Sequence, residues 1–172
     1  MTASIRKAIP SDARRIAEVH VETWRAAYRG LLSDSVLAGL SADDTEDRWR
    51  ERIAKPWGHI YVAERNEQVV GFVACGACED EDVDHGKVGE IYAVYVQPGE
   101  WRRGHGAALA REALRCLRED GFDEVILWVL RGNEQAIRFY EAEGFVADGG
   151  SKVKRRADGT EMQVVRYRRS IA

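Results

Sequence analysis

The sequence predicts a mixed α/β fold: a mostly antiparallel central sheet with one parallel β-α-β pair, flanked by helices. Three observations lead to this expectation. Residues 60–78 read as two strands joined by a short turn, and strands joined in this way are antiparallel. Residues 90–130 read as strand, helix and buried strand, an order that makes the two strands parallel with a right-handed crossover. The length of 172 residues, 45% hydrophobic and 32% charged, is typical of one globular domain, which we expect over residues 1–172.

The first third of the chain predicts one short strand and two or three helices. Residues 4–8 are expected to form the strand, which Pro10 ends. Apolar residues recur at helical spacing from Ile16 to Ala27, and further helical segments are expected before Lys55. Residues of the type that caps or breaks helices punctuate this region at Ser11-Asp12, Gly30, Ser33, Gly39 and Ser41.

The remaining elements follow from alternating or continuous apolar patterns. Val125–Leu130 is an unbroken apolar run, which predicts a strand buried on both faces. Asn133 is expected to cap a helix that Gly144 ends. The other expected elements are strands at 60–64, 68–78, 88–97, 145–147 and 162–168, and a helix at 103–120.

Charge and cysteine content exclude several classes of protein. The formal net charge is −3, so the whole chain gives no reason to expect a nucleic-acid partner. An acidic run at 79–84 and a basic run at 152–169 are expected to be a solvated loop and solvated edge-strand faces. No apolar stretch approaches the ~18 residues of a membrane helix, and residues 1–7 lack the apolar centre of a signal peptide. With three cysteines, typical of a reducing compartment, we expect a cytoplasmic protein without a metal site.

The most informative motif lies at residues 96–109, where a strand ends, the chain turns over Gly104 and Gly106, and a helix begins. Glycines let backbone N–H groups approach a ligand, and the start of a helix adds unpaired donors and a partial positive charge. Arg102 and Arg103 can add charge-assisted contacts, so the segment suits a pyrophosphate. It lacks the P-loop and dinucleotide-binding fingerprints. A tight turn without a ligand is the alternative.

Two motifs of this chain resemble those of the Gcn5-related N-acetyltransferase (GNAT) superfamily. Gly104-His105-Gly106 follows Val96-Gln97-Pro98 at the distance of the family's cofactor motif, Gln/Arg-x-x-Gly-x-Gly/Ala. Residues 133–145 look like the second hallmark, Asn-x-x-Ala-x-x-Phe-Tyr-x-x-x-Gly-Phe. One departure is Trp101, which stands at the first motif position in place of Gln or Arg; a shifted match that begins at Arg103 also satisfies the formula.

The resemblance implies acetyl-CoA as the cosubstrate, with its pyrophosphate at the glycine turn. In such enzymes the preceding strand splays from its parallel neighbour, and its exposed main chain binds the pantetheine arm. By position, the residues implied in cofactor binding are Val94, Tyr95, Val96, Arg102, Arg103, Gly104, His105, Gly106, Ala107 and Asn133. No metal is implied.

Two residues are implied in the chemistry by the same resemblance. Glu90 holds the place of the catalytic glutamate in the histone-acetyltransferase branch, where it takes a proton from the acceptor; a surface glutamate or a relay through water are the alternatives. In the ribosomal-protein branch the base lies on the next strand, where this chain has Trp128. Tyr140 matches the tyrosine that faces the cofactor sulfur and can protonate the leaving thiolate, and a core aromatic is the alternative.

The implied function is transfer of an acetyl group from acetyl-CoA to a primary amine of a small molecule or peptide. The alternative is a non-catalytic sensor that binds acyl-CoA. Trp24 and Tyr28, together with Trp49, are expected in the helices that wall the acceptor site, where aromatic rings can stack on a ligand or an ammonium, or simply pack. The acceptor itself and a homodimer are left open.

Overall fold

The computed structural model describes residues 2–55 and 57–172, and its architecture confirms the expected fold class. Within the described residues the strands form a seven-stranded sheet in the order β1-β2-β3-β4-β5-β7-β6, in which β4 and β5 are parallel and the other neighbours antiparallel. The strands are β1 Ser4–Lys7, β2 Gly58–Arg65, β3 Gln68–Ala77, β4 Val88–Val96, β5 Glu124–Leu130, β6 Val146–Arg155 and β7 Glu161–Ser170.

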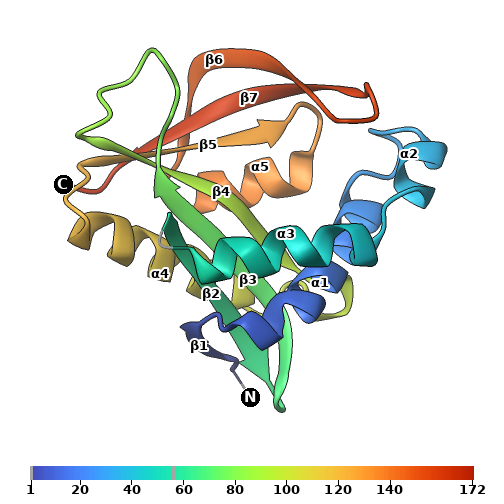
Figure 1. Ribbon diagram of the computed structural model, residues 1–172. Helices are drawn as coiled ribbons and strands as arrows, with labels where there is room; N and C mark the ends of the chain where they lie inside the picture. Colours follow the sequence, from blue (N-terminus) through green and yellow to red (C-terminus); the bar gives the residue numbers. More distant parts are fainter. Residues whose placement is uncertain (1, 56) are drawn as a thin grey trace.

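Helices cover both faces of this sheet (Figure 1). The α-helices are α1 Ala13–Ala27, α2 Asp34–Ala38, α3 Ala42–Ala54, α4 His105–Glu119 and α5 Glu134–Ala142, with 3₁₀ turns at Pro10–Asp12 and Pro98–Glu100. On one face, α1 and α3 pack on β2, β3 and β4 around Phe72. On the other, α4 and α5 pack around Leu109, Leu117 and Leu127. Two separate apolar layers therefore sandwich the sheet.

Several caps form as expected. The hydroxyl of Ser33 accepts from the Val36 N–H at 3.3 Å, and the hydroxyl of Ser41 from the Asp44 N–H at 3.4 Å. Ser11-Asp12 was expected to cap α1, but no side chain there makes a capping hydrogen bond to that helix. The Asp12 carboxylate lies in a 3₁₀ turn, where it accepts from the Ile9 N–H at 2.8 Å and from Arg6, so it caps that turn rather than α1.

Most residues of the acidic and basic runs are exposed, as the sequence predicts, but Arg166 departs from this expectation. Arg166 on β7 is only 7% exposed, and its guanidinium binds Asp82 and Asp148, each at 2.7 Å. Lys152 on β6 binds Asp80 at 3.1 Å. The acidic loop is thus folded onto the basic strands, and the polar stretch after residue 147 continues β6 as far as Arg155 because it pairs with β7.

The strands β4 and β5 part halfway along their length. Their pairing runs from Val88–Glu124 to Ile91–Leu127 and does not continue beyond it in the described residues. The pairing of β3 with β4 skips Tyr92 at this point, which marks a β-bulge. A bulge bends its strand, so the end of β4 turns away from β5 and a gap opens in the middle of the sheet.

No helix in the described part of the chain is long and apolar enough to cross a membrane. The single domain over residues 1–172 and the homodimer stay predictions.

Candidate active site

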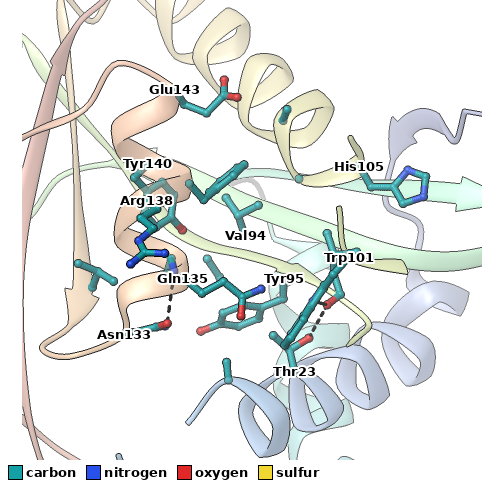
Figure 2. Close-up of a pocket in the computed structure, with 18 of the residues that line it drawn as sticks. Thr23, Val94, Tyr95, Trp101, His105, Asn133, Gln135, Arg138, Tyr140 and Glu143 are labelled. Atoms are coloured by element: carbon teal, nitrogen blue, oxygen red, sulfur yellow. Dashed lines mark hydrogen bonds between the residues drawn. The ribbon is translucent and has the colours of Figure 1, made fainter. Parts of the chain in front are cut away.

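A cavity of about 630 Å³ lies where β4 and β5 part (Figure 2). This volume falls in the range of ordinary ligand sites, ~300–1,000 Å³. Most of the residues expected at the site line it: Tyr28, Val94, Tyr95, Val96, Arg102, Gly104, His105, Gly106, Ala107, Asn133 and Tyr140. Arg103, Trp24 and Glu90 lie outside this lining.

The main chain at the end of β4 presents alternate residues to the gap. The Gln97 N–H donates to the Val70 carbonyl of β3 at 2.8 Å. Since backbone groups alternate in direction along a strand, the main chain of Tyr95 also faces β3, and Val94 and Val96 face the gap. The expectation of free main chain at all three residues therefore needs a correction at Tyr95, whose side chain alone can reach the cavity.

The Val96 carbonyl is already occupied. The Trp101 indole donates to it at 2.6 Å, and the Thr23 hydroxyl at 3.1 Å (Figure 2). These bonds tie the end of β4 to the glycine turn and to α1. Sequence reasoning treated Trp101 only as a departure from a motif and missed Thr23, because neither bond has a local sequence signal. The main-chain groups left for a ligand are those of Val94 and the N–H of Val96.

The glycine turn has the backbone that the sequence predicts for an anion site. Gly104 immediately precedes α4 with φ +86°, and no atom lies within 4 Å of the position where its Cβ would stand. At Gly106 a Cβ would lie 3.3 Å from the Phe139 ring, so glycine permits the close approach of α4 and α5. The helix therefore opens onto free space, and its first N–H groups have no intrahelical acceptors.

The imidazole of His105 is turned away from the cavity (Figure 2). Its Nε2 lies 3.1 Å from Glu100, whose carboxylate also accepts from Arg65 at 2.8 Å. This network joins β2 to the first residue of α4. The His105 side chain consequently holds the turn in place, and only its main chain is free to meet an anion.

Tyr140 on α5 is 9% exposed and lines the cavity from the side of α5. Its ring packs on Phe139 and Phe145, with centroids 5.1 and 5.9 Å away. Burial raises the pKa of the Tyr140 phenol, so the hydroxyl keeps its proton at neutral pH and can donate it. Asn133, at the start of the same helix, accepts from the Ala136 N–H at 3.3 Å.

Glu90 pairs with Ile126 just before the strands part. Paired residues of parallel strands share a face, so Glu90 lies on the same face as Ile126 and Trp128. Burial raises the pKa of Glu90 to about 7, against the opposing effect of Lys154. A carboxyl group with that pKa can both take and release protons near neutral pH.

Comparison with known proteins places the chain in a family. The model of the Acetyltransferase (GNAT) family matches residues 4–145. The chain belongs to this family. The uncharacterized N-acetyltransferase YuaI of Bacillus subtilis is 32% identical over 139 residues, which cover 81% of this chain and 78% of that protein. A mycothiol acetyltransferase of Thermobispora bispora is 34% identical over 72% of this chain, but the match covers 42% of that longer protein.

The fold is likewise that of a GNAT acetyltransferase. The crystal structure of PaiA N-acetyltransferase from Thermoplasma acidophilum, in complex with coenzyme A, superposes with a TM-score of 0.71 at 20% identity, covering 99% of both chains. Family membership confirms the expected enzyme class, an acetyl-CoA-dependent N-acetyltransferase. In this GNAT chain the parted strands, the glycine turn and Tyr140 surround one cavity.

Proposed function

We propose that this protein transfers the acetyl group of acetyl-CoA to a primary amine of a small molecule or peptide. The observation that carries the proposal is the continuous cavity between β4 and β5, which runs from the glycine turn to Tyr140. A ligand that spans it can have phosphates at one end and a reacting carbon at the other.

The residues at the turn fit the pyrophosphate of coenzyme A. The N-terminus of α4 offers main-chain donors, and Arg102, with φ +61° beside Gly104, lines the same cavity. Arg138, on α5, adds a guanidinium to another part of the lining, on the side of Asn133 and Gln135 (Figure 2). The side chain of Arg103 is about half exposed, and its guanidinium lies 3.6 Å from the Glu100 carboxylate. Arg103 therefore attracts the phosphates through its charge and makes no direct contact with them. Main-chain donors with flanking arginines are the donor set that phosphates prefer.

The pantetheine arm then lies along β4. It meets the free main chain of Val94 and the N–H of Val96, and Asn133 faces it from the start of α5. When bound, coenzyme A supplies the activated thioester. The protein supplies orientation and two proton transfers.

Tyr140 and Glu90 divide the proton transfers in this proposal. The carboxylate of Glu90 takes a proton from the acceptor ammonium, and it does so through an intervening water because Glu90 lies outside the cavity lining. The Tyr140 phenol gives its proton to the departing thiolate. The acceptor nitrogen loses a second proton as the amide forms and the C–S bond breaks, and this proton returns Tyr140 to its phenol form, while Glu90 releases its proton to solvent.

The first test is binding of acetyl-CoA followed by turnover. A ligand at 100 times its Kd stabilises a protein by about 2.7 kcal/mol, which for this chain length raises Tm by about 5–11 °C. The measurements are a thermal melt and calorimetry with acetyl-CoA, then release of thiol in the presence of a panel of primary amines. Binding without transfer to any amine would favour the acyl-CoA sensor, and absence of binding would refute the proposal.

A further inference from the structure

An aromatic cluster on the α1 side of the cavity is not accounted for by the cofactor. His20 on α1 stands between Trp24 and Trp49, with ring centroids 5.3 and 5.9 Å away. Its ring also lies 5.3 Å from that of Tyr95, which lines the cavity. The cluster therefore adjoins the cavity at Tyr95.

Two guanidinium groups cover the tryptophans of this cluster. The Cζ of Arg52, on α3, lies 5.1 Å from the ring centroid of Trp49. The Cζ of Arg156, just after β6, lies 5.2 Å from that of Trp24. Positive charge thus reaches His20 from two elements that lie about a hundred residues apart in the sequence. We call His20, Trp24, Trp49, Arg52 and Arg156 the arginine wall.

His20 is neutral in this setting and offers a hydrogen-bond donor. The Trp49 indole donates to its Nδ1 at 3.1 Å, so the ring proton resides on Nε2. Burial, with Arg48, Arg156 and Arg52 nearby, lowers the pKa of His20 to about 4. The imidazole can therefore donate to an anion, and it adds no charge of its own.

The arginines of the wall carry charge that the protein neutralises only in part. Among the described residues, Arg52 makes no ion pair, whereas Arg50 on the same helix pairs with Glu46 at 2.6 Å. Arg156 has one carboxylate neighbour, Asp158, at 3.4 Å.

Trp24 connects the wall to the cavity. The residue is 9% exposed, and its buried indole nitrogen lies beside the hydroxyl of Tyr95, which lines the cavity. The ring of Trp24 is therefore a packed support for Arg156, and the guanidinium above it is the group that a ligand can meet.

We propose that the arginine wall binds a carboxylate of the acceptor, so that the amines acetylated here are amino carboxylates such as amino acids or short peptides. The inference rests on the proposed N-acetyl transfer and names the substrate class for the same site. An ammonium would not stack on Trp24 or Trp49, because each ring already carries a guanidinium that would repel it. A carboxylate instead meets two guanidinium groups and the imidazole N–H of His20.

Direct binding to the CoA-saturated protein tests the inference without requiring turnover. The probes are ω-amino carboxylates from glycine to 6-aminohexanoate and the carboxamide that matches each one, titrated by calorimetry. A hydrogen bond to a charged group corresponds to about a tenfold to hundredfold change in affinity, so carboxylates should bind that much more tightly. This preference should fall at least severalfold in R52Q and in R156Q.

R50Q is the matched control, because Arg50 lies on the same helix and already has carboxylate partners. It should keep the wild-type preference, and all three variants should bind acetyl-CoA normally. Equal binding of carboxylates and carboxamides, no binding of either, or an unchanged preference in R52Q and R156Q would each overturn the inference. Failure of every bound amine to be acetylated would instead refute the proposed transfer and leave the carboxylate site standing.

Discussion

The two ends of the cavity are built in different ways. The proposed cofactor end, formed by β4, α4, β5 and α5, offers its ligand mainly backbone: a glycine turn, a helix N-terminus and the free edge of a parted strand. The proposed acceptor end, near α1, uses side chains of α1, α3 and the β6–β7 hairpin, which lie behind the cavity lining at Tyr95. Backbone geometry suits a cosubstrate common to a family, and interchangeable side chains suit an acceptor that differs between members.

Of the two proposed catalytic residues, Tyr140 lines the cavity, and its substitution should have the largest effect on activity. Tyr140→Phe keeps the ring and its packing against Phe139 and Phe145 but removes the proton that the leaving thiolate needs. We expect kcat to fall by about 10²–10⁴-fold while acetyl-CoA affinity and Tm stay near wild type. Steady-state kinetics and calorimetry measure these quantities. A normal kcat would reduce Tyr140 to a packing residue.

Two substitutions at Gly104 test whether the glycine turn binds the pyrophosphate. They introduce side chains of the same size, one charged and one neutral. Asn and Asp both tolerate positive φ, and the space beside Gly104 is open. Gly104→Asp should weaken acetyl-CoA binding by about 10²–10³-fold through repulsion of the pyrophosphate. Gly104→Asn has the same size without the charge and serves as the control. Similar affinities in the two variants, measured by calorimetry, would place the pyrophosphate elsewhere.

The role of Glu90 should be visible in how the reaction rate and the free energy of unfolding depend on pH. Because its pKa is raised to about 7, the wild-type base is ionised only above that pH, so the rate advantage of wild type over Glu90→Gln should vanish near pH 5.5 and grow through pH 7. A pH–rate profile of both enzymes measures this. A deficit that does not change with pH would indicate a role in positioning the substrate.

The same raised pKa has a smaller consequence for folding, with a definite sign. The folded state holds the Glu90 proton up to pH about 7, whereas the unfolded chain releases it at its ordinary value of 4.5, so ionisation costs stability as pH rises between the two. Glu90→Gln should therefore match wild type near pH 4 and exceed it by up to about 3 kcal/mol at pH 8. Thermal or urea unfolding at both pH values measures the difference. Equal stabilities at pH 8 would mean that the carboxyl group is solvated.

Local sequence patterns were sufficient to predict the cofactor end, because each of its features depends on residues that are close together in the sequence. Gly104 is required by its positive φ, Asn133 by the cap of α5, and the strand from Glu124 to Leu130 by its continuous apolar run. The length of β6 and the ion pairs of Arg166 could not be predicted in this way. They depend on pairing with β7 and on a loop more than eighty residues away, so the burial of Arg166 within an otherwise exposed basic run was not predicted.

The sequence by itself determined the fold class, the glycine turn and the family, because these depend on residues close together in the chain. Only the tertiary structure decided that β4 parts from β5 at Ile91, that Trp101 and Thr23 share the Val96 carbonyl, and that the His105 side chain faces Glu100. The arginine wall is another feature that only the tertiary structure decided. Residues 20, 52 and 156 meet only because packing of α1, α3 and the β6–β7 hairpin brings them together, and no periodicity in a single chain segment records a contact between segments so far apart.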